Sequence, residues 1–306
     1  MRKPAFLPDL FLRKSCGKII GTILLGGYAM SVENAIILGL VQGLTEFLPV
    51  SGSGHLSILN NLFGMSTTLD SHPLFDVLLR LAALLAVLIV YWEDIRAMCR
   101  ETLGLLNLGP EAGQLRGRSP GARLFFMLVI ATLPQLLILP IKKPIEALYA
   151  NSFFVGTALI LTGCLLYVSD RMLPGKKGVG GMTLLDALIV GLCRCVGVIP
   201  GISRSGVTIT AGIAAGLRRD FAVKFAFLLS VPAALGAIIA GLVEALSEGA
   251  ELANVPAYLI GMAVAMVAGI AAIQLLQLIA KRGKFGGFAY YCWVAGALSI
   301  ILTMIF

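Results

Sequence analysis

The residues that decide the fold read NAIILGLVQGLTEFLPVSGSG, at positions 34–54, because the chain repeats this pattern 152 positions later. Residues 186–206 read DALIVGLCRCVGVIPGISRSG and align with the first copy without a gap. Each copy begins as an apolar helix and breaks at proline and glycine into a short loop rich in hydroxyl groups. In a membrane protein, helices broken at corresponding points of two halves indicate a binding site.

Composition is that of a membrane protein. Hydrophobic residues make up 58% of the chain and charged residues 13%, and the mean hydropathy is +0.94, which soluble domains do not reach. Stretches long and apolar enough to cross the hydrocarbon core as helices lie at residues 74–92, 121–141, 150–169, 221–246, 255–280 and 286–306. The two repeat segments are apolar but interrupted, and non-helical backbone at membrane depth requires surrounding protein or a water-filled cavity. We therefore predict re-entrant hairpins for both.

The predicted fold is an all-α membrane protein with six transmembrane helices and two re-entrant helical hairpins, arranged as an inverted-topology repeat. Most lysines and arginines fall in connections near residues 96–123, 171–177, 218–224 and 281–284, which this topology places on one face. By the positive-inside rule that face is cytoplasmic, so the first hairpin opens outward, the second inward, and the C-terminus lies outside. The net charge of +8 is explained by topology and needs no nucleic-acid partner.

Residues 30–306 form a single integral-membrane domain in this prediction, with repeat 1 at about 33–141 and repeat 2 at about 183–280. Residues 1–29 do not fit the repeat, because basic residues there precede an apolar run at 19–29 that is too short to span a membrane. They are either a dispensable N-terminal extension or a signal or membrane-surface element.

Six ionisable side chains fall where lipid should surround the chain, and such charges mark functional sites because they are costly in hydrocarbon. They are Glu46, His55, Asp76, Arg80, Arg194 and Arg204. Asp76 and Arg80 are one helical turn apart, so a purely structural ion pair between them is an equal alternative.

Arg204 stands in the loop of the second copy, PGISRSGVT at residues 200–208, where the chain opens into its next helix. Exposed N–H groups at a helix start favour an anion, and the planar guanidinium suits phosphate oxygens. Ser203, Ser205 and Thr208 add hydroxyl donors. This combination predicts a phosphate-binding loop, against the alternative of a structural loop.

The first copy carries a different set of polar residues. Gln42 and Glu46 are four positions apart and so face one side of a helix; Ser51, Ser53 and His55 follow. A carboxylate and an imidazole are the groups that proton transfer or metal-assisted phosphate hydrolysis requires. Opposite an arginine-bearing anion loop, these residues complete a site for phosphoryl transfer.

The motifs GLTEFLPVSGSGH at residues 43–55 and PGISRSGVT at residues 200–208 together resemble the bacterial undecaprenyl-diphosphatase family, the bacitracin-resistance membrane phosphatases, over about residues 30–306. The resemblance implies hydrolysis of undecaprenyl diphosphate to undecaprenyl phosphate and inorganic phosphate, which recycles the lipid carrier of cell-wall sugars. It also implies a site on the outer face of the bacterial inner (cytoplasmic) membrane, a polyprenyl diphosphate as lipid substrate, and a divalent cation, magnesium or calcium.

Carried over by position, the resemblance implies three sets of site residues. They are Glu46, His55, Ser53, Ser51 and Arg204 for catalysis, Glu46 and Gln42 for the metal, and Gln42, Ser203, Arg204, Ser205, Thr208 and Arg194 for the substrate. Three positions depart from the family pattern: Gly52 stands where serine is usual, Arg80 where glutamine or histidine is usual, and Arg194 where glutamine is usual. The two added cations either replace metal charge or bind a different anionic head group. With Gly52 in place, Ser53 is the preferred nucleophile, and Ser51, His55 or an activated water are the alternatives.

A second class of protein fits the same predicted fold. Inverted repeats with broken helices and midplane charges also characterise carriers, and fold alone does not separate carriers from enzymes. The alternatives are therefore a polyprenyl-phosphate transporter or flippase, or a divergent paralogue acting on another lipid-linked phosphate. The glutamate and histidine of the first copy favour the enzyme. A homodimer remains an open alternative.

Overall fold

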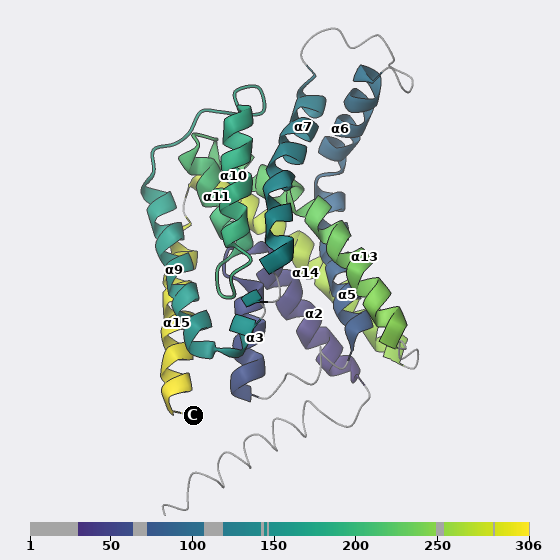
Figure 1. The fold of residues 1–306 in the computed structure, drawn as a ribbon, viewed down its shortest axis with the longest axis vertical. Helices are drawn as coiled ribbons and strands as arrows, with labels where there is room; N and C mark the ends of the chain where they lie inside the picture. Colours follow the sequence, from purple (N-terminus) through teal and green to yellow (C-terminus); the bar gives the residue numbers. More distant parts are fainter. Residues whose placement is uncertain are drawn as a thin grey trace, which may run out of the picture.

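The computed structural model describes residues 30–63, 72–106, 119–141, 144–145, 147–248, 254–283 and 285–305, and these residues are almost entirely helical (Figure 1). The predicted extension at residues 1–29 lies outside the described residues. The α-helices are α2 (Val32–Phe47), α3 (Gly52–Phe63), α5 (Pro73–Val90), α6 (Trp92–Leu105), α7 (Pro120–Thr132), α9 (Ser152–Arg171), α10 (Leu184–Val196), α11 (Arg204–Ala214), α12 (Arg219–Leu228), α13 (Ser230–Glu248), α14 (Val255–Arg282) and α15 (Gly286–Ile305). Two 3-10 helices, η1 (Leu133–Ile141) and η2 (Ala147–Ala150), lie between α7 and α9.

Six helical segments in the described part of the chain are long and apolar enough to cross a membrane, which confirms the predicted number. They are Pro73–Val90, Pro120–Ile138, Ser152–Arg171, Arg219–Ser247, Val255–Arg282 and Gly286–Ile305. The fourth span consists of α12 and α13, which meet at Leu229. The second span continues as the 3-10 helix η1 after Thr132, because Pro134 and Pro140 have no N–H group to continue an α-helix.

α6 is a helix that the sequence did not indicate, because hydropathy detects spans and α6 is rich in charged residues. It runs beside α7 (Figure 1). The Glu101 carboxylate of α6 accepts hydrogen bonds from the N–H groups of Gly121 and Ala122, at 2.7 and 3.3 Å. A carboxylate at this position stabilises the N-terminus of α7 and holds the two helices together.

The two repeat segments form helix pairs whose tips meet inside the molecule. α2 contacts α3 and α10 contacts α11, and the two pairs approach each other from opposite ends (Figure 1). At the tips, a Cβ on Gly54 would lie 2.9 Å from the Gly201 Cα atom, and the Ser205 hydroxyl donates to the Leu48 carbonyl at 3.4 Å. This arrangement is compatible with re-entrant hairpins in an inverted repeat, and both stay predictions.

The first helix of each pair packs against the last span of the other repeat. In α2, Gly39 lies against the backbone of Gly261 in α14; in α10, the corresponding Gly191 lies against the backbone of Ala131 in α7. Neither contact leaves room for a Cβ, and small residues allow such close approach between membrane helices. α5 packs on α13, while α9 packs on α15 outside the two repeats. The same glycine of the motif therefore has the same packing role twice.

The second pair begins with a capping box at α10. The Thr183 hydroxyl accepts from the Asp186 N–H at 3.1 Å, and the Asp186 carboxylate accepts from the Thr183 N–H at 2.8 Å. Lys177 forms an ion pair with the same carboxylate at 2.9 Å. Burial raises the pKa of Asp186, but the hydrogen bonds from Thr183 and Lys177 lower it by more, so the pKa lies below its ordinary value.

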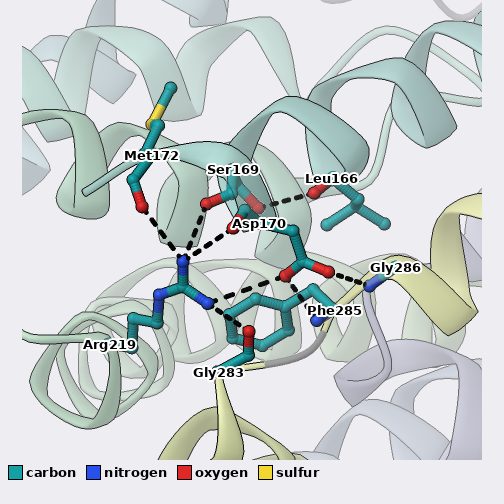
Figure 2. A network of polar contacts seen from close by, with 8 residues as sticks. All are labelled: Leu166, Ser169, Asp170, Met172, Arg219, Gly283, Phe285 and Gly286. Atoms are coloured by element: carbon teal, nitrogen blue, oxygen red, sulfur yellow. Dashed lines mark hydrogen bonds and ion pairs between the residues drawn. The ribbon is translucent and has the colours of Figure 1, made fainter. Parts of the chain in front are cut away.

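Arg219 joins several segments at one end of the molecule (Figure 2). Its guanidinium donates to three carbonyls at the end of α9, those of Ser169, Asp170 and Met172, and to the carbonyl of Gly283 after α14. The Asp170 carboxylate lies 3.7 Å from this guanidinium and accepts from backbone N–H groups at the start of α15. The start of α12 and the neighbouring ends of α9, α14 and α15 are therefore held together.

The basic connections meet at this end, as the charge pattern predicts. Lys224 in α12 forms an ion pair with Asp94 in α6 at 2.8 Å, and Arg123 in α7 donates to the Met182 carbonyl at 2.7 Å. Together with Arg219, these contacts link the described parts of all four basic connections. Which side of the membrane this basic end faces stays a prediction.

Candidate active site

A cavity of about 150 Å³ lies where the two tips meet α5 and the start of α13. Its polar lining consists of Gln42, Glu46, Ser53, Asp76, Arg80, Arg194, Arg204, Ser205 and Ser230. Phe227 and alanines of α12 and α13 form an apolar wall. The cavity therefore brings together most of the predicted site residues from both repeats; the exceptions are Ser51, His55, Ser203 and Thr208.

A smaller polar recess of about 20 Å³ lies between the tips. It shares Glu46, Ser53, Arg204 and Ser205 with the cavity. Ser51 and Ser203, which do not line the cavity, line this recess. Hydroxyl groups of both copies thus converge beside one carboxylate and one guanidinium, in a space for about one water molecule.

Arg204 is the first residue of α11, and hydrogen bonds hold the loop before it. Gly201 has a φ of 89° and lies against the α9 backbone, so glycine is required there. The Thr162 hydroxyl of α9 donates to the Gly201 carbonyl at 2.9 Å and accepts from the Ser203 N–H at 3.1 Å. The Ser203 hydroxyl caps α11 by accepting from the Gly206 N–H at 3.1 Å. Among the described residues, none hydrogen-bonds the Arg204 guanidinium, which is available to a ligand.

The first tip positions Glu46 and Ser53. Ser51 adopts a left-handed φ of 65°, a strained conformation for a residue other than glycine, and its hydroxyl accepts from the Gly54 N–H at 3.3 Å. The Glu46 carboxylate accepts from the Gln42 amide at 3.3 Å, which confirms that the two share one helix face. Ser53 lines both the cavity and the recess, without a hydrogen-bond partner among the residues that the structure describes.

Gly52, where the family pattern has serine, begins α3 beside α2. A Cβ on Gly52 would lie 2.8 Å from the Thr45 Oγ1 atom, so a side chain there would point at α2. Ser53 is therefore the residue of the first tip whose hydroxyl faces the cavity.

His55 lies on a different face of α3 from Ser53. Residues two apart on an α-helix are separated by about 200° around its axis, and His55 lines neither the cavity nor the recess. Its Nδ1 atom donates to the Ser51 carbonyl and its Nε2 atom accepts from the Tyr291 hydroxyl, both at 2.8 Å. Because both ring nitrogens are occupied, the geometry favours a positioning role at the Ser51 turn. Direct proton transfer by His55 stays a prediction.

Arg194, in the last turn of α10, is buried with only 6% of its surface exposed. Its Nε atom donates to the Gln135 side chain of η1 at 3.2 Å, and its Nη1 atom donates to the Thr208 hydroxyl at 3.3 Å. Thr208 donates in turn to the Arg204 carbonyl at 2.6 Å. Thr208, predicted as a substrate-binding residue, therefore lies behind Arg194 and holds it rather than lining the cavity.

Asp76 and Arg80 do form the ion pair that the sequence left as one of two alternatives, with the Arg80 Nε atom 2.8 Å from Asp76 Oδ2. Both residues nevertheless line the cavity. Its lining therefore contains three guanidinium groups and two carboxylates. A site with this excess of positive charge attracts anions.

The chain is similar to known proteins over most of its length. The family model described as bacitracin resistance protein BacA matches residues 35–298. The chain belongs to this family. An undecaprenyl-diphosphatase of Desulforapulum autotrophicum is 40% identical over 277 residues, which cover 89% of this chain and 98% of that protein. The undecaprenyl-diphosphatase of Carboxydothermus hydrogenoformans is 36% identical over 276 residues, covering 89% and 98% of the two chains. That of Methanobrevibacter smithii is 39% identical over 276 residues, covering 88% and 96%.

The divalent cation that the family resemblance implies does not fit the lining found in this BacA-family chain. Magnesium binds through one or two carboxylates together with water and substrate phosphates, and calcium takes more oxygen ligands. In the described ranges, His, Cys, Asp and Glu nowhere gather in threes as an all-protein metal site, so a cation here would depend on Glu46 and Asp76. Asp76 is engaged by Arg80, and Gln42 presents its amide nitrogen to Glu46. Two further arginines line the same cavity and would repel a dication.

Sequence reasoning missed three residues that shape this BacA-family site: Gln135, Thr162 and Tyr291. Gln135 is an amide within an apolar predicted span, and that contrast is a signal that could have found it. Thr162 and Tyr291 carry no such signal, because threonine and tyrosine are common in membrane helices. Their roles depend on which helices pack together.

Proposed function

We propose that this protein is a membrane phosphatase that converts undecaprenyl diphosphate to undecaprenyl phosphate and inorganic phosphate. Relatives that are 36% and 40% identical over nearly their whole length bear the name undecaprenyl-diphosphatase. The observation that carries the proposal is the unbonded guanidinium of Arg204, on a rigid loop, in one cavity with Glu46 and Ser53. A fixed cation, a carboxylate and a hydroxyl are the groups that phosphoryl transfer needs.

In the proposed mechanism, Arg204 binds the terminal phosphate and stabilises its charge in the transition state. The Ser53 hydroxyl attacks the terminal phosphorus, and Glu46 accepts its proton and transfers it to the leaving phosphate oxygen. The anhydride P–O bond breaks and undecaprenyl phosphate departs. A water molecule then attacks the phosphoserine and loses a proton to Glu46, and the Ser53 oxygen regains this proton as inorganic phosphate leaves. His55 keeps the turn before Ser53 in place through the Ser51 carbonyl.

The prenyl chain needs an apolar path beside the cavity. A groove of about 280 Å³ with an almost wholly apolar lining lies between α5, α6, α7, η1 and the α12–α13 junction. Phe227 lines the cavity and its neighbour Leu228 lines the groove, so both spaces border that junction. In our proposal the chain occupies this groove. Leu136→Trp at its wall should then raise KM for undecaprenyl diphosphate more than for a short prenyl diphosphate, and equal effects would contradict this path.

We also propose that the basic end faces the cytoplasm and that the cavity opens on the outer face of the inner membrane. The charged cavity residues of α5, Asp76 and Arg80, lie in the N-terminal half of this helix, away from the basic end. The C-terminus also lies away from the basic end (Figure 1) and would be outside. A C-terminal alkaline phosphatase fusion should therefore be active, and an active cytoplasmic reporter at the same place would reverse the orientation.

The decisive experiment is phosphate release from undecaprenyl diphosphate by the purified protein in detergent, where no compartments exist. Arg204→Ala and Ser53→Ala should each abolish release without changing the elution profile or helix content. Arg218→Ala, an exposed residue of the basic end, is the matched control. Near-normal turnover in Arg204→Ala would contradict the site, and turnover in Ser53→Ala would assign the attack to water. Saturable binding without release would identify a carrier instead.

A further inference from the structure

Arg194 is a buried cation without a carboxylate partner. Both of its hydrogen bonds go to neutral groups, the Gln135 amide and the Thr208 hydroxyl. Within the described ranges, no Asp or Glu lies at ion-pair distance from it. An uncompensated buried charge is costly, and a protein retains one only where an opposite charge can reach it. Among the described residues, the carboxylate whose charge acts on Arg194 is that of Glu46, which lines the same cavity and also acts on Arg80. Since this one carboxylate cannot balance both Arg194 and Arg204, the further negative charge is that of a ligand.

Arg80 faces the same cavity from another wall, on α5. Its ion pair with Asp76 uses the Nε atom, and its two terminal nitrogens have no hydrogen-bond partner among the described residues. Arg204 reaches the cavity from α11 and Arg194 from α10. The three guanidinium groups come from three different helices and therefore enclose a space, as a ligand with several anionic oxygens requires.

We propose that Arg80 and Arg194, together with Arg204, bind both phosphate groups of the lipid diphosphate, and that their charges take the place of a divalent cation. The proposal rests on the phosphatase function proposed above. A guanidinium keeps its charge and offers a fork of N–H donors that matches phosphate oxygens. Fixed cations stabilise the charge of a transferring phosphoryl group, which is one role of a metal ion in such reactions. Gln135 and Thr208 are positioning residues, because they act through Arg194.

The two copies of the repeat differ in charge at the position of Arg194. Arg194 corresponds to Gln42 in the first copy, 152 positions earlier. Gln42 is neutral and donates to Glu46, whereas Arg194 brings a full charge to the same cavity from the other hairpin. The site therefore gains positive charge where the first copy has a neutral amide, and it does so without gaining a carboxylate to hold a metal.

The test measures ligand binding as well as turnover, with EDTA or with magnesium. The probe is a prenyl methylenediphosphonate, which the enzyme cannot hydrolyse, titrated by calorimetry into the purified protein in detergent. The wild-type protein should bind this probe in EDTA with an affinity within about twofold of that in magnesium. Its rate of phosphate release from undecaprenyl diphosphate should likewise differ by no more than about threefold between EDTA and magnesium. Arg194→Gln and Arg80→Gln should each weaken binding in EDTA by about 10- to 100-fold, the loss of a charge-assisted contact. Arg218→Gln is the control and should bind as the wild type does.

Two results would overturn the inference: loss of wild-type binding in EDTA with recovery in magnesium, or unchanged binding in both glutamine variants. Arg194→Lys keeps the charge without the fork and replaces Arg194→Gln if the latter does not fold. It should bind more weakly than the wild type and remain insensitive to EDTA, and magnesium-dependent binding in wild type and lysine variant alike would refute the proposal. Binding in EDTA with no phosphate release under any condition would sustain this inference while the proposed phosphatase function fails.

Discussion

Removal of the Arg219 side chain should destabilise the protein far more than removal of its neighbour Arg218. The side chains of Arg219 and Asp170 are only 11% and 19% exposed, and the guanidinium also binds carbonyls at the ends of α9 and α14. Breaking a buried ion pair by deleting one partner costs about 3–5 kcal/mol. Asp170 keeps its backbone donors at the start of α15, so we expect the lower end, about 3 kcal/mol, for Arg219→Ala.

Arg218→Ala is the matched control. Arg218 pairs with Asp220, but these side chains are 56% and 44% exposed, and such surface pairs contribute about 0–1 kcal/mol. The assay is equilibrium unfolding in mixed micelles with increasing sodium dodecyl sulfate, followed by circular dichroism. Equal destabilisation of the two variants, or an unchanged midpoint in Arg219→Ala, would refute the reasoning that this junction holds the helix ends together.

Three further predictions concern helix packing at Gly191, the capping box at Asp186 and the Tyr291–His55 contact. Gly191→Leu should destabilise the protein by about 2–3 kcal/mol or more, because its Cβ would meet the α7 backbone. Gly236→Leu is the control, because its side chain would project into open space. Similar unfolding curves for the two variants would contradict the prediction. Asp186→Asn should cost about 1 kcal/mol near neutral pH. The folded-state pKa of Asp186 is lowered, so the stability that its carboxylate adds is present above the unfolded-state pKa of about 3.9 and is lost as pH falls through the folded-state value. A stability difference between wild type and Asp186→Asn that persists in strong acid would contradict this. Tyr291→Phe should cost about 1 kcal/mol and leave the pH profile of phosphate release unchanged, while a shifted profile would assign proton transfer to His55.

Features that depend on composition or on one helix turn could be predicted from the sequence. The six spans follow from hydropathy, and the Asp76–Arg80 contact follows because residues four apart on a helix are neighbours in any tertiary structure. The Gln42–Glu46 contact belongs to the same class.

Features that depend on packing between distant segments could not be predicted. Gln135 and Arg194 are 59 positions apart and meet only because η1 packs against α10. His55 and Ser53 belong to one motif, but the motif does not state that α3 begins at Gly52. Once the helix begins there, its rotation sends the two side chains to different sides.

The close approach of Gly54 to Gly201 at the hairpin tips bears on whether the protein is an enzyme or a carrier. A carrier that alternates access would have to part these tips and break the Ser205–Leu48 hydrogen bond. An enzyme needs the reverse, since Ser53 comes from one hairpin and Arg204 from the other and their separation must not drift. Gly54 sets this separation, because a methyl group there would lie 2.9 Å from the Gly201 Cα atom. Adding one at Gly54 would change the spacing of hydroxyl and guanidinium while leaving both residues in the chain, whereas a methyl group on Gly201 would meet the α9 backbone instead.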